Sequence, residues 1–394
     1  MRIKQNVCSK LWTDTNIDFR RQTLRHCCKQ DPHDITLDEI NELGVDVFEK
    51  YPLHLYNKNK MLFDNKIPDS CNFCKLNNEH SIRHSWNTWS DDFINENRPQ
   101  LLKQDLTNYF EIDMGDKCDL ACVYCGPQSS TTWQKELGWP SQRENSEKIQ
   151  WRETMMNLLE QRLTQGIETL GGITINFLGG EPTLIPDTYK ILDKLLPILK
   201  QYKHKPNILF TTNLNTKSTL MDRFVNTMES TKEYVNWSVG VSIEDVNERA
   251  ELVRYGLDFN RFTKNLVRIA PHCKVYFTCT QNFLSMPYFG DIVEYMFNTM
   301  PTVYNDDWGI TANCVYDNAL DPAYLDHDMV DWRGIENILT KYNVQSDIID
   351  HMNNMEARAG TKTPDDKFMQ TYQLLLKRSE KYLELFPHLK TKLG

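Results

Sequence analysis

The sequence predicts an α/β fold built around a parallel sheet, and two observations support this prediction. From about residue 108 onward, short apolar runs alternate with longer stretches of helical periodicity. The apolar runs have the length of single strands, and the composition is globular, with 40% hydrophobic and 25% charged residues. Strands that alternate with helices favour parallel pairing through right-handed crossovers. A chain of 394 residues is long enough for a large α/β core with further modules.

Six strands are expected in this part of the chain, with a helix between each pair of successive strands. The strand candidates span residues 108–114, 173–180, 207–213, 237–243, 274–281 and 308–316. The intervening helices are expected at residues 151–167, 189–202, 221–230, 262–270 and 291–300. Six strand-helix units are fewer than a closed eight-stranded barrel requires. Beyond this region the strand pattern ends, and residues 321–343 and 368–386 predict helices.

A cysteine triplet directly follows the first strand candidate. Cys118, Cys122 and Cys125 form the spacing C-x-x-x-C-x-x-C. Three thiolates on one short loop suit a cubane [4Fe–4S] cluster, and they leave one of its irons without a protein ligand. A zinc site is the alternative, but structural zinc usually shows two paired C-x-x-C knuckles, and the order of strand, cysteine loop and second strand is not a zinc-ribbon pattern.

The second strand candidate ends in a glycine-rich turn with one acidic residue, Gly179-Gly180-Glu181. Glycines let the backbone approach a ligand closely, and a carboxylate is a suitable partner for an ammonium group. An aromatic residue, Tyr124, stands before the last cysteine of the triplet. Taken with the cysteine spacing, this arrangement resembles the radical S-adenosylmethionine (SAM) enzymes.

The resemblance implies a cofactor, a reaction and a fold. Cys118, Cys122 and Cys125 would bind the cluster, whose open iron chelates the amino and carboxylate groups of SAM. An electron from the cluster would cleave SAM to a 5′-deoxyadenosyl radical. Tyr124 would lie beside the adenine, and Gly179, Gly180 and Glu181 would surround the methionine amino group. The implied architecture is a partial (β/α)6 TIM-like barrel.

Polar residues at the strand ends are the next candidates, because ligands bind at the carboxyl ends of barrel strands. These residues are Thr211, Thr212, Asn213, Ser242, Glu244, Thr280, Gln281 and Asn282. The resemblance implies contacts with the ribose and carboxylate of SAM at such positions, for which we select Thr212, Asn213 and Ser242, the last being the best match. Arg254 resembles the arginine that meets the SAM carboxylate, with Arg249 as its competitor. Apart from Ser242, a capped or solvated loop is an equally good explanation of these strand-end polar residues.

A second cysteine set precedes the barrel and contains Cys8, Cys27, Cys28, Cys71 and Cys74. Their layout, with Trp12, Glu79, Ser81, Arg83 and the run Cys125-Gly126-Pro127, resembles the twitch or SPASM type of radical SAM protein. The resemblance implies an auxiliary [4Fe–4S] cluster on Cys8, Cys27, Cys71 and Cys74, with Cys28 left over. A tetrahedral zinc ion on the same four ligands is the alternative. Leu11 replaces the usual proline, and no glycine precedes the cysteine pair, so this module departs from the common pattern.

Three regions follow from these patterns: an auxiliary-cluster module at 1–100, the partial barrel at 101–320 and a helical extension at 321–394. We expect a radical SAM enzyme that abstracts hydrogen from a peptide or small-molecule substrate and takes electrons from a donor such as flavodoxin or ferredoxin. Modification of a nucleotide or nucleic acid, or a non-enzymatic iron–sulfur or zinc protein, are the alternatives. The sequence assigns no catalytic side chain beyond the cofactor site.

Charge and hydropathy restrict the partners and the location. The net charge of −9, the pI near 5.6 and the lack of a long basic run disfavour nucleic acid as a partner. No apolar run has the length of a membrane span, and the first residues show no secretory signal. Eleven cysteines in such a chain indicate metal or redox chemistry in a reducing compartment. We therefore expect a cytoplasmic protein.

Overall fold

The computed structural model describes residues 7–27, 30–71, 89–102, 106–140, 145–300, 308–315 and 318–393. The chain divides into two compact units. The first contains Met1–Gly115, Gln142–Phe210 and Thr231–Asn236, and the second contains Asp116–Ser141, Thr211–Ser230 and Trp237–Gly394. Both units combine helices with largely parallel strands, which confirms the predicted α/β class.

The sheet of the first unit has the strand order β7-β6-β4-β1-β2-β3 among the described residues. These strands are β1 (Asp14–Asp18), β2 (Thr23–Arg25), β3 (His33–Asp34), β4 (Tyr109–Asp113), β6 (Thr174–Leu178) and β7 (Asn207–Thr212). Strands β1, β4, β6 and β7 run parallel, whereas β2 and β3 form an antiparallel edge beside β1. The last two residues of β7 already belong to the second unit.

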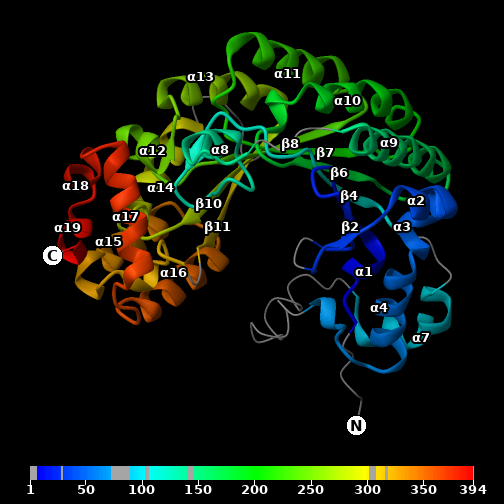
Figure 1. The fold of residues 1–394 in the computed structure, drawn as a ribbon, viewed down its shortest axis with the longest axis horizontal. Helices are drawn as coiled ribbons and strands as arrows, with labels where there is room; N and C mark the ends of the chain where they lie inside the picture. Colours follow the sequence, from blue (N-terminus) through cyan, green and yellow to red (C-terminus); the bar gives the residue numbers. More distant parts are fainter. Residues whose placement is uncertain are drawn as a thin grey trace. The chain divides into compact units, whose positions relative to one another are not determined.

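Side-chain alternation gives this sheet one apolar face and one polar face. Phe110, Ile175 and Ile208 are level with one another on neighbouring strands, and all three are fully buried. On the opposite face Glu111 accepts a hydrogen bond from Asn16 of β1 and lies level with Asn176 of β6. Helices α9 (Ser146–Gly166) and α10 (Pro186–Leu199) run along β6 and β7 in Figure 1. Burial of the apolar face thus fixes the register of the strands.

The amino-terminal helices are α1 (Lys10–Thr13), α2 (Leu37–Leu43), α3 (Val47–Lys50), α4 (Pro52–Phe63) and α7 (Asp91–Leu101). Among them, α1, α4 and α7 supply the buried apolar cluster around Trp12. The Trp12 indole donates a hydrogen bond to the Leu101 carbonyl at 2.9 Å, and both side chains are fully buried. A buried ion pair between Lys58 and Glu49, 2.8 Å long, lies in the same region. These contacts tie α1 to α7 and α3 to α4.

Among the described residues, the second unit carries three parallel strands in the order β11-β10-β8 and a small antiparallel pair. The three strands are β8 (Asn236–Ser242), β10 (Lys274–Gln281) and β11 (Trp308–Cys314), and the pair consists of β5 (Ala121–Cys122) and β9 (Arg254–Tyr255). Helices α8 (Thr131–Glu136), α11 (Ser218–Thr231), α12 (Asn247–Val253), α13 (Phe259–Ile269) and α14 (Phe289–Thr299) belong to this unit or end at its border. Five more helices follow β11: α15 (Trp332–Lys341), α16 (Ser346–Arg358), α17 (Asp366–Arg378), α18 (Lys381–Leu385) and α19 (Pro387–Leu393).

The structure confirms the six predicted strands, which are β4, β6, β7, β8, β10 and β11. The prediction of a helix beginning at residue 321 is wrong, because short 3₁₀ turns at Pro322–Tyr324 and His327–Met329 precede α15. Asp321 accepts a hydrogen bond from the Ala323 amide, and Asp331 accepts one from the Gly334 amide, so two separate caps replace one continuous helix. None of the described helices is both long and apolar enough to cross a membrane.

Candidate functional site

The cysteine loop follows β4 in the sequence and belongs to the second unit, where the first turn of α8 holds its backbone. Thr131 accepts a hydrogen bond from the Cys118 amide at 3.2 Å and donates one to the Cys118 carbonyl at 3.0 Å. The Trp133 indole donates to the Cys122 carbonyl at 2.8 Å. Cys122 is buried, whereas Cys118 and Cys125 are half-buried. The backbone is therefore fixed while two of the three thiols remain accessible.

A short antiparallel ladder joins the loop to the segment after α12. Cys122 of β5 lies opposite Arg254 of β9, and the Val123 amide donates to the Val253 carbonyl at 2.9 Å. Gly256 follows with a φ of +98°, and a Cβ atom there would lie 3.2 Å from the Asp119 carbonyl oxygen. A glycine is needed at this position both for the backbone conformation and for the close approach.

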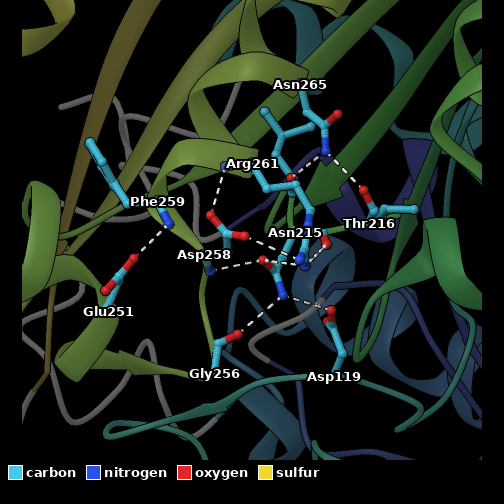
Figure 2. A network of polar contacts seen from close by, with 10 residues as sticks. Asp119, Asn215, Thr216, Glu251, Gly256, Asp258, Phe259, Arg261 and Asn265 are labelled. Carbon is cyan, nitrogen blue, oxygen red and sulfur yellow. Dashed lines mark hydrogen bonds and ion pairs between the residues drawn. The ribbon is translucent and has the colours of Figure 1, made fainter. Parts of the chain in front are cut away.

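Asp119, between the first two cysteines, is the polar anchor of the loop. Its carboxylate accepts hydrogen bonds from Asn213 at 3.1 Å and from Asn215 at 2.8 Å. Figure 2 shows how Asn215 also donates to the Gly256 carbonyl and accepts from the Asp258 amide. The Asn215 side chain, just after β7, thus joins the cysteine loop to the start of α13.

A buried ion pair sets the electrostatics beside Cys122. Arg254 Nε lies 3.0 Å from Glu244 Oε2, and their side chains are 6% and 0% exposed. Arg254 Nη1 also donates to Cys122 Sγ at 3.6 Å. The pKa of the Cys122 thiol is lowered to about 7, because the Cys125 thiol hydrogen-bonds to it and the Arg254 charge lies close. Burial raises the pKa of Glu244, although Arg254 acts in the opposite direction. The same hydrogen bond between Cys122 and Cys125 raises the pKa of the Cys125 thiol well above its ordinary value, so the two thiols shift in opposite directions.

Arg378, at the end of α17, holds the cysteine loop from the carboxyl-terminal helices. Its guanidinium makes two hydrogen bonds of 2.7 Å to Glu136 and donates to the Ala121 carbonyl at 3.0 Å. It also lies 3.9 Å from the centre of the Trp133 ring and 4.7 Å from that of Tyr255. The side chain is only 3% exposed. Arg378 therefore contacts both helix α8 and the β5–β9 ladder, the two elements that hold the cysteine loop.

Replacing Arg378 with alanine is expected to lower the free energy of unfolding by roughly 2–4 kcal/mol, because the Glu136 carboxylate and the Ala121 carbonyl lose their buried, charged hydrogen-bond donor. Amide hydrogen exchange in the segment 118–125 is expected to accelerate at the same time. Arg378→Lys keeps the charge but loses the planar two-point contact, so it is expected to restore only part of the protection. Lys377→Ala, at the exposed neighbouring position of α17, is the matched control. Equal exchange in Arg378→Ala and Lys377→Ala would contradict this role.

The Gly179-Gly180-Glu181 turn lies in the first unit and is shaped by close backbone contacts. Gly179 has a φ of +131°, and a Cβ atom there would come within 2.7 Å of the Gly115 carbonyl oxygen. Glu181 is fully buried, and its carboxylate accepts a hydrogen bond from the Thr183 amide at 3.1 Å. The positive φ and the close approach to Gly115 are sufficient to require a glycine at position 179. A role for the three residues around an amino group remains a prediction.

The other predicted cofactor residues occupy defined positions in the second unit. The Tyr124 ring centre lies 5.9 Å from the Arg254 guanidinium carbon. Thr212 accepts a hydrogen bond from the Leu214 amide at 3.1 Å, and the half-buried Ser242 lies level with Thr278 of β10. The cysteine loop, Tyr124, Asn213 and Arg254 are thus brought together by direct contacts. Their roles toward SAM remain predictions.

Arg249, the competitor of Arg254, is engaged elsewhere. It pairs with Asp245 at 2.8 Å, and its guanidinium lies 4.0 Å from the centre of the Tyr288 ring. No contact between Arg249 and the cysteine loop is found among the described residues.

The amino-terminal cysteine set is described only in part, since Cys28, Cys74, Glu79, Ser81 and Arg83 lie outside the described residues. Cys8, Cys27 and Cys71 are each half-buried. Cys8 and Cys71 pack against the apolar cluster around Trp12. Gln30 donates to the Cys27 carbonyl and to the Ser70 hydroxyl, which brings the segment of Cys27 beside the residue before Cys71. The four-ligand assignment remains a prediction.

The side chains of the cysteine loop are of the kinds that bind an iron–sulfur cluster, although they are not arranged around a single metal ion. Within the described ranges no group of three or more His, Cys, Asp or Glu side chains stands in a ready metal-binding arrangement. The loop nevertheless combines three thiols with N–H donors directed at two of the sulfurs. Such donors stabilise the negative charge of a thiolate-bound cluster. The residues present therefore fit the group.

Sequence reasoning missed three residues that hold the loop. Asp119 lies inside the cysteine motif, and Asn215 lies two residues beyond Asn213, so polar residues at those spacings were an available signal. Arg378 is 242 residues from its partner Glu136, and nothing in the local sequence connects the two.

Comparison with known proteins finds one family model and several distant relatives that match parts of the chain. Residues 112–294 match the Radical SAM superfamily. The chain is 25% identical over 160 residues to GTP 3′,8-cyclase from Clostridium botulinum strain Hall and from strain Okra. These matches cover 40% of this chain and only 42% of each cyclase. Among solved structures, Streptococcus suis SuiB bound to S-adenosylmethionine aligns with a TM-score of 0.41 and 16% identity, over 87% of this chain and 70% of that one. SuiB bound to its precursor peptide SuiA aligns with a TM-score of 0.40 and 14% identity, over 85% and 69%.

Proposed function

We propose that the chain is a radical SAM enzyme, because residues 112–294 match the Radical SAM superfamily. Cys118, Cys122 and Cys125 would bind a [4Fe–4S] cluster whose open iron binds SAM. When bound, the cluster and SAM supply an electron and a 5′-deoxyadenosyl radical for abstraction of hydrogen from a substrate C–H bond. The observation that carries this proposal is the cysteine loop, in which three cysteines lie on one segment and the buried Arg254 and Asn213 donate hydrogen bonds to two of their sulfurs.

The residues of the chain would position the loop. Asp119 fixes the turn between the first two cysteines through Asn213 and Asn215. Trp133 and Arg378 hold the backbone on either side of Cys122. A rigid, partly buried loop maintains one geometry while a reactive species is used, and this is the usual contribution of a protein to cofactor chemistry.

We further propose that SAM contacts the residues that the resemblance indicates. They are Tyr124, Gly179, Gly180, Glu181, Thr212, Asn213, Ser242 and Arg254. The backbone constraint at Gly179 and the burial of Glu181 are compatible with a rigid ligand-binding turn. Arg254 already pairs with Glu244, so its guanidinium would bind the SAM carboxylate and the Glu244 carboxylate at the same time.

The substrate is proposed to be a peptide or a small molecule, and the electron donor an external protein such as flavodoxin or ferredoxin. The cyclase relatives are named for GTP, and SuiB is named with a precursor peptide, so both classes occur among similar proteins. The amino-terminal set Cys8, Cys27, Cys71 and Cys74 is proposed to hold an auxiliary [4Fe–4S] cluster of the twitch or SPASM type. A zinc ion on the same ligands is the competing assignment.

The proposal is tested by electron paramagnetic resonance of the anaerobically reconstituted, dithionite-reduced protein. Addition of SAM is expected to change the spectrum, because SAM would bind directly to the open iron. Unchanged spectra at saturating SAM would contradict the proposal and would favour a non-enzymatic iron–sulfur protein. The matched control is the Cys118/Cys122/Cys125→Ala variant, in which any remaining signal is expected to be insensitive to SAM.

A further inference from the structure

Two side chains of the second unit donate N–H hydrogen bonds to sulfurs of the cysteine loop. Arg254 Nη1 lies 3.6 Å from Cys122 Sγ, and Asn213 Nδ2 lies 3.8 Å from Cys118 Sγ. Both distances are within the range of hydrogen bonds to sulfur, whose larger radius lengthens them relative to bonds to oxygen. Arg254 and Asn213 are each only 5% exposed. Two of the three thiols therefore have a buried donor.

The position of each donor is fixed independently. Arg254 lies directly opposite Cys122 in the β5–β9 ladder, and its guanidinium is paired with the buried Glu244. Asn213 is held by Asp119, the residue after Cys118, and that carboxylate is in turn held by Asn215. The network in Figure 2 places Asn215 between Asp119 and the start of α13. Neither donor can turn away without breaking another buried polar contact.

We propose that Arg254 and Asn213 raise the reduction potential of the cluster by hydrogen-bonding to two of its ligating sulfurs. This inference rests on the proposed function, since it assumes that the cysteine loop holds the cluster. Reduction adds one electron to the cluster, and much of the added negative charge resides on sulfur. Donors that point at those sulfurs stabilise the reduced form, and both donors here are buried.

Glu244 acts against Arg254 in this arrangement. Its carboxylate is the buried partner of Arg254, and a negative charge there opposes the accumulation of negative charge on the cluster. The net effect of Arg254 therefore depends on the N–H···S bond as well as on its charge. Replacing both partners together isolates that bond, because Arg254→Met/Glu244→Gln removes one positive and one negative charge and leaves the net charge unchanged.

The test is a redox titration of the reconstituted full-length protein without SAM, followed by electron paramagnetic resonance. The double variant Arg254→Met/Glu244→Gln is expected to titrate at a more negative potential than wild type, and Glu244→Gln alone at a more positive one. The expected change in the reduction equilibrium of the double variant is tenfold or more, which is 59 mV for a one-electron couple. Omitting SAM keeps any contact with its carboxylate out of the measurement.

Asn213 supplies an independent test with a matched control. Asn213→Leu removes the donor to Cys118 together with contacts to Asp119 and to the Asn215 amide. Asn215→Leu removes contacts to Asp119, Gly256 and Asp258 but no contact to sulfur. The first variant is expected to shift the potential to more negative values, and the second is expected to keep the wild-type potential. If the Arg254 double variant fails to retain iron, this pair of variants decides the matter.

The failure of this inference and that of the proposed function are distinguishable. If the cluster of the wild-type protein responds to SAM but the Asn213 and Arg254 variants all titrate at the wild-type potential, the tuning role is wrong and the proposed function stands. The same holds if the double variant only weakens SAM binding, which would assign Arg254 to the SAM carboxylate. A wild-type cluster that does not respond to SAM would overturn the proposed function itself.

Discussion

Replacing Cys118, Cys122 and Cys125 with alanine is expected to remove about half of the iron and sulfide from the reconstituted protein, because one of two proposed [4Fe–4S] clusters loses all its ligands. The remaining iron would belong to the amino-terminal set of Cys8, Cys27, Cys71 and Cys74. The measurement is the iron and sulfide content per chain, compared between wild type and the triple variant. A triple variant that retains the full wild-type iron content would contradict the assignment of this loop.

The same measurement separates the two assignments of the amino-terminal set. If the triple variant loses all of its iron and retains zinc, the auxiliary site is a zinc site that stabilises the amino-terminal module. If it loses all of its iron and contains no zinc, the auxiliary site is wrong altogether. A second variant with alanine at Cys8, Cys27, Cys71 and Cys74 is the complement, and it is expected to retain the half that the triple variant loses.

Replacing Glu244 with alanine is expected to lower the free energy of unfolding by about 3–5 kcal/mol, because it leaves the buried Arg254 guanidinium without its carboxylate partner. Glu244 also accepts a hydrogen bond from the Thr280 amide, so the end of β10 loses a contact as well. The unfolding free energy is measured by urea titration of wild type and variant under identical conditions.

A surface ion pair provides the control for this prediction. Glu248 lies 2.9 Å from Lys381, and their side chains are 61% and 54% exposed. Glu248→Ala is expected to cost about 1 kcal/mol or less, since exposed pairs are screened by water. If Glu244→Ala is no more destabilising than Glu248→Ala, the buried pair does not contribute the expected amount of about 3–5 kcal/mol to the free energy of unfolding.

The main strands were predictable because each has apolar residues at the alternating positions that the fold buries. Phe110 and Ile112 in β4 and Ile175 and Phe177 in β6 are of this kind. Strand β1 was not predicted, because its sequence DTNID contains a single aliphatic residue, Ile17, among polar ones. Its polar side chains are buried by pairing with β4, for example Asn16 with Glu111, and this is a tertiary effect that no local pattern reveals.

The site was predictable at the level of motifs but not of the contacts that support them. The cysteine spacing and the polar residue Asn213 were visible in the sequence, and the structure brings Asn213 to Cys118. The β5–β9 ladder could not be expected, because strands of two residues carry no periodicity. The contact of Arg378 with the loop depends on how the last helices fold back within the second unit, and sequence separation hides such contacts.

Formation of 5′-deoxyadenosine tests the central claim most directly. The reconstituted wild-type protein, incubated anaerobically with dithionite and SAM, is expected to produce 5′-deoxyadenosine and methionine. Omission of dithionite, or use of the Cys118/Cys122/Cys125→Ala variant, is expected to abolish the product. A wild-type protein that contains its full complement of iron and sulfide, yet forms no 5′-deoxyadenosine under these conditions, would contradict the assignment of this chain as a radical SAM enzyme.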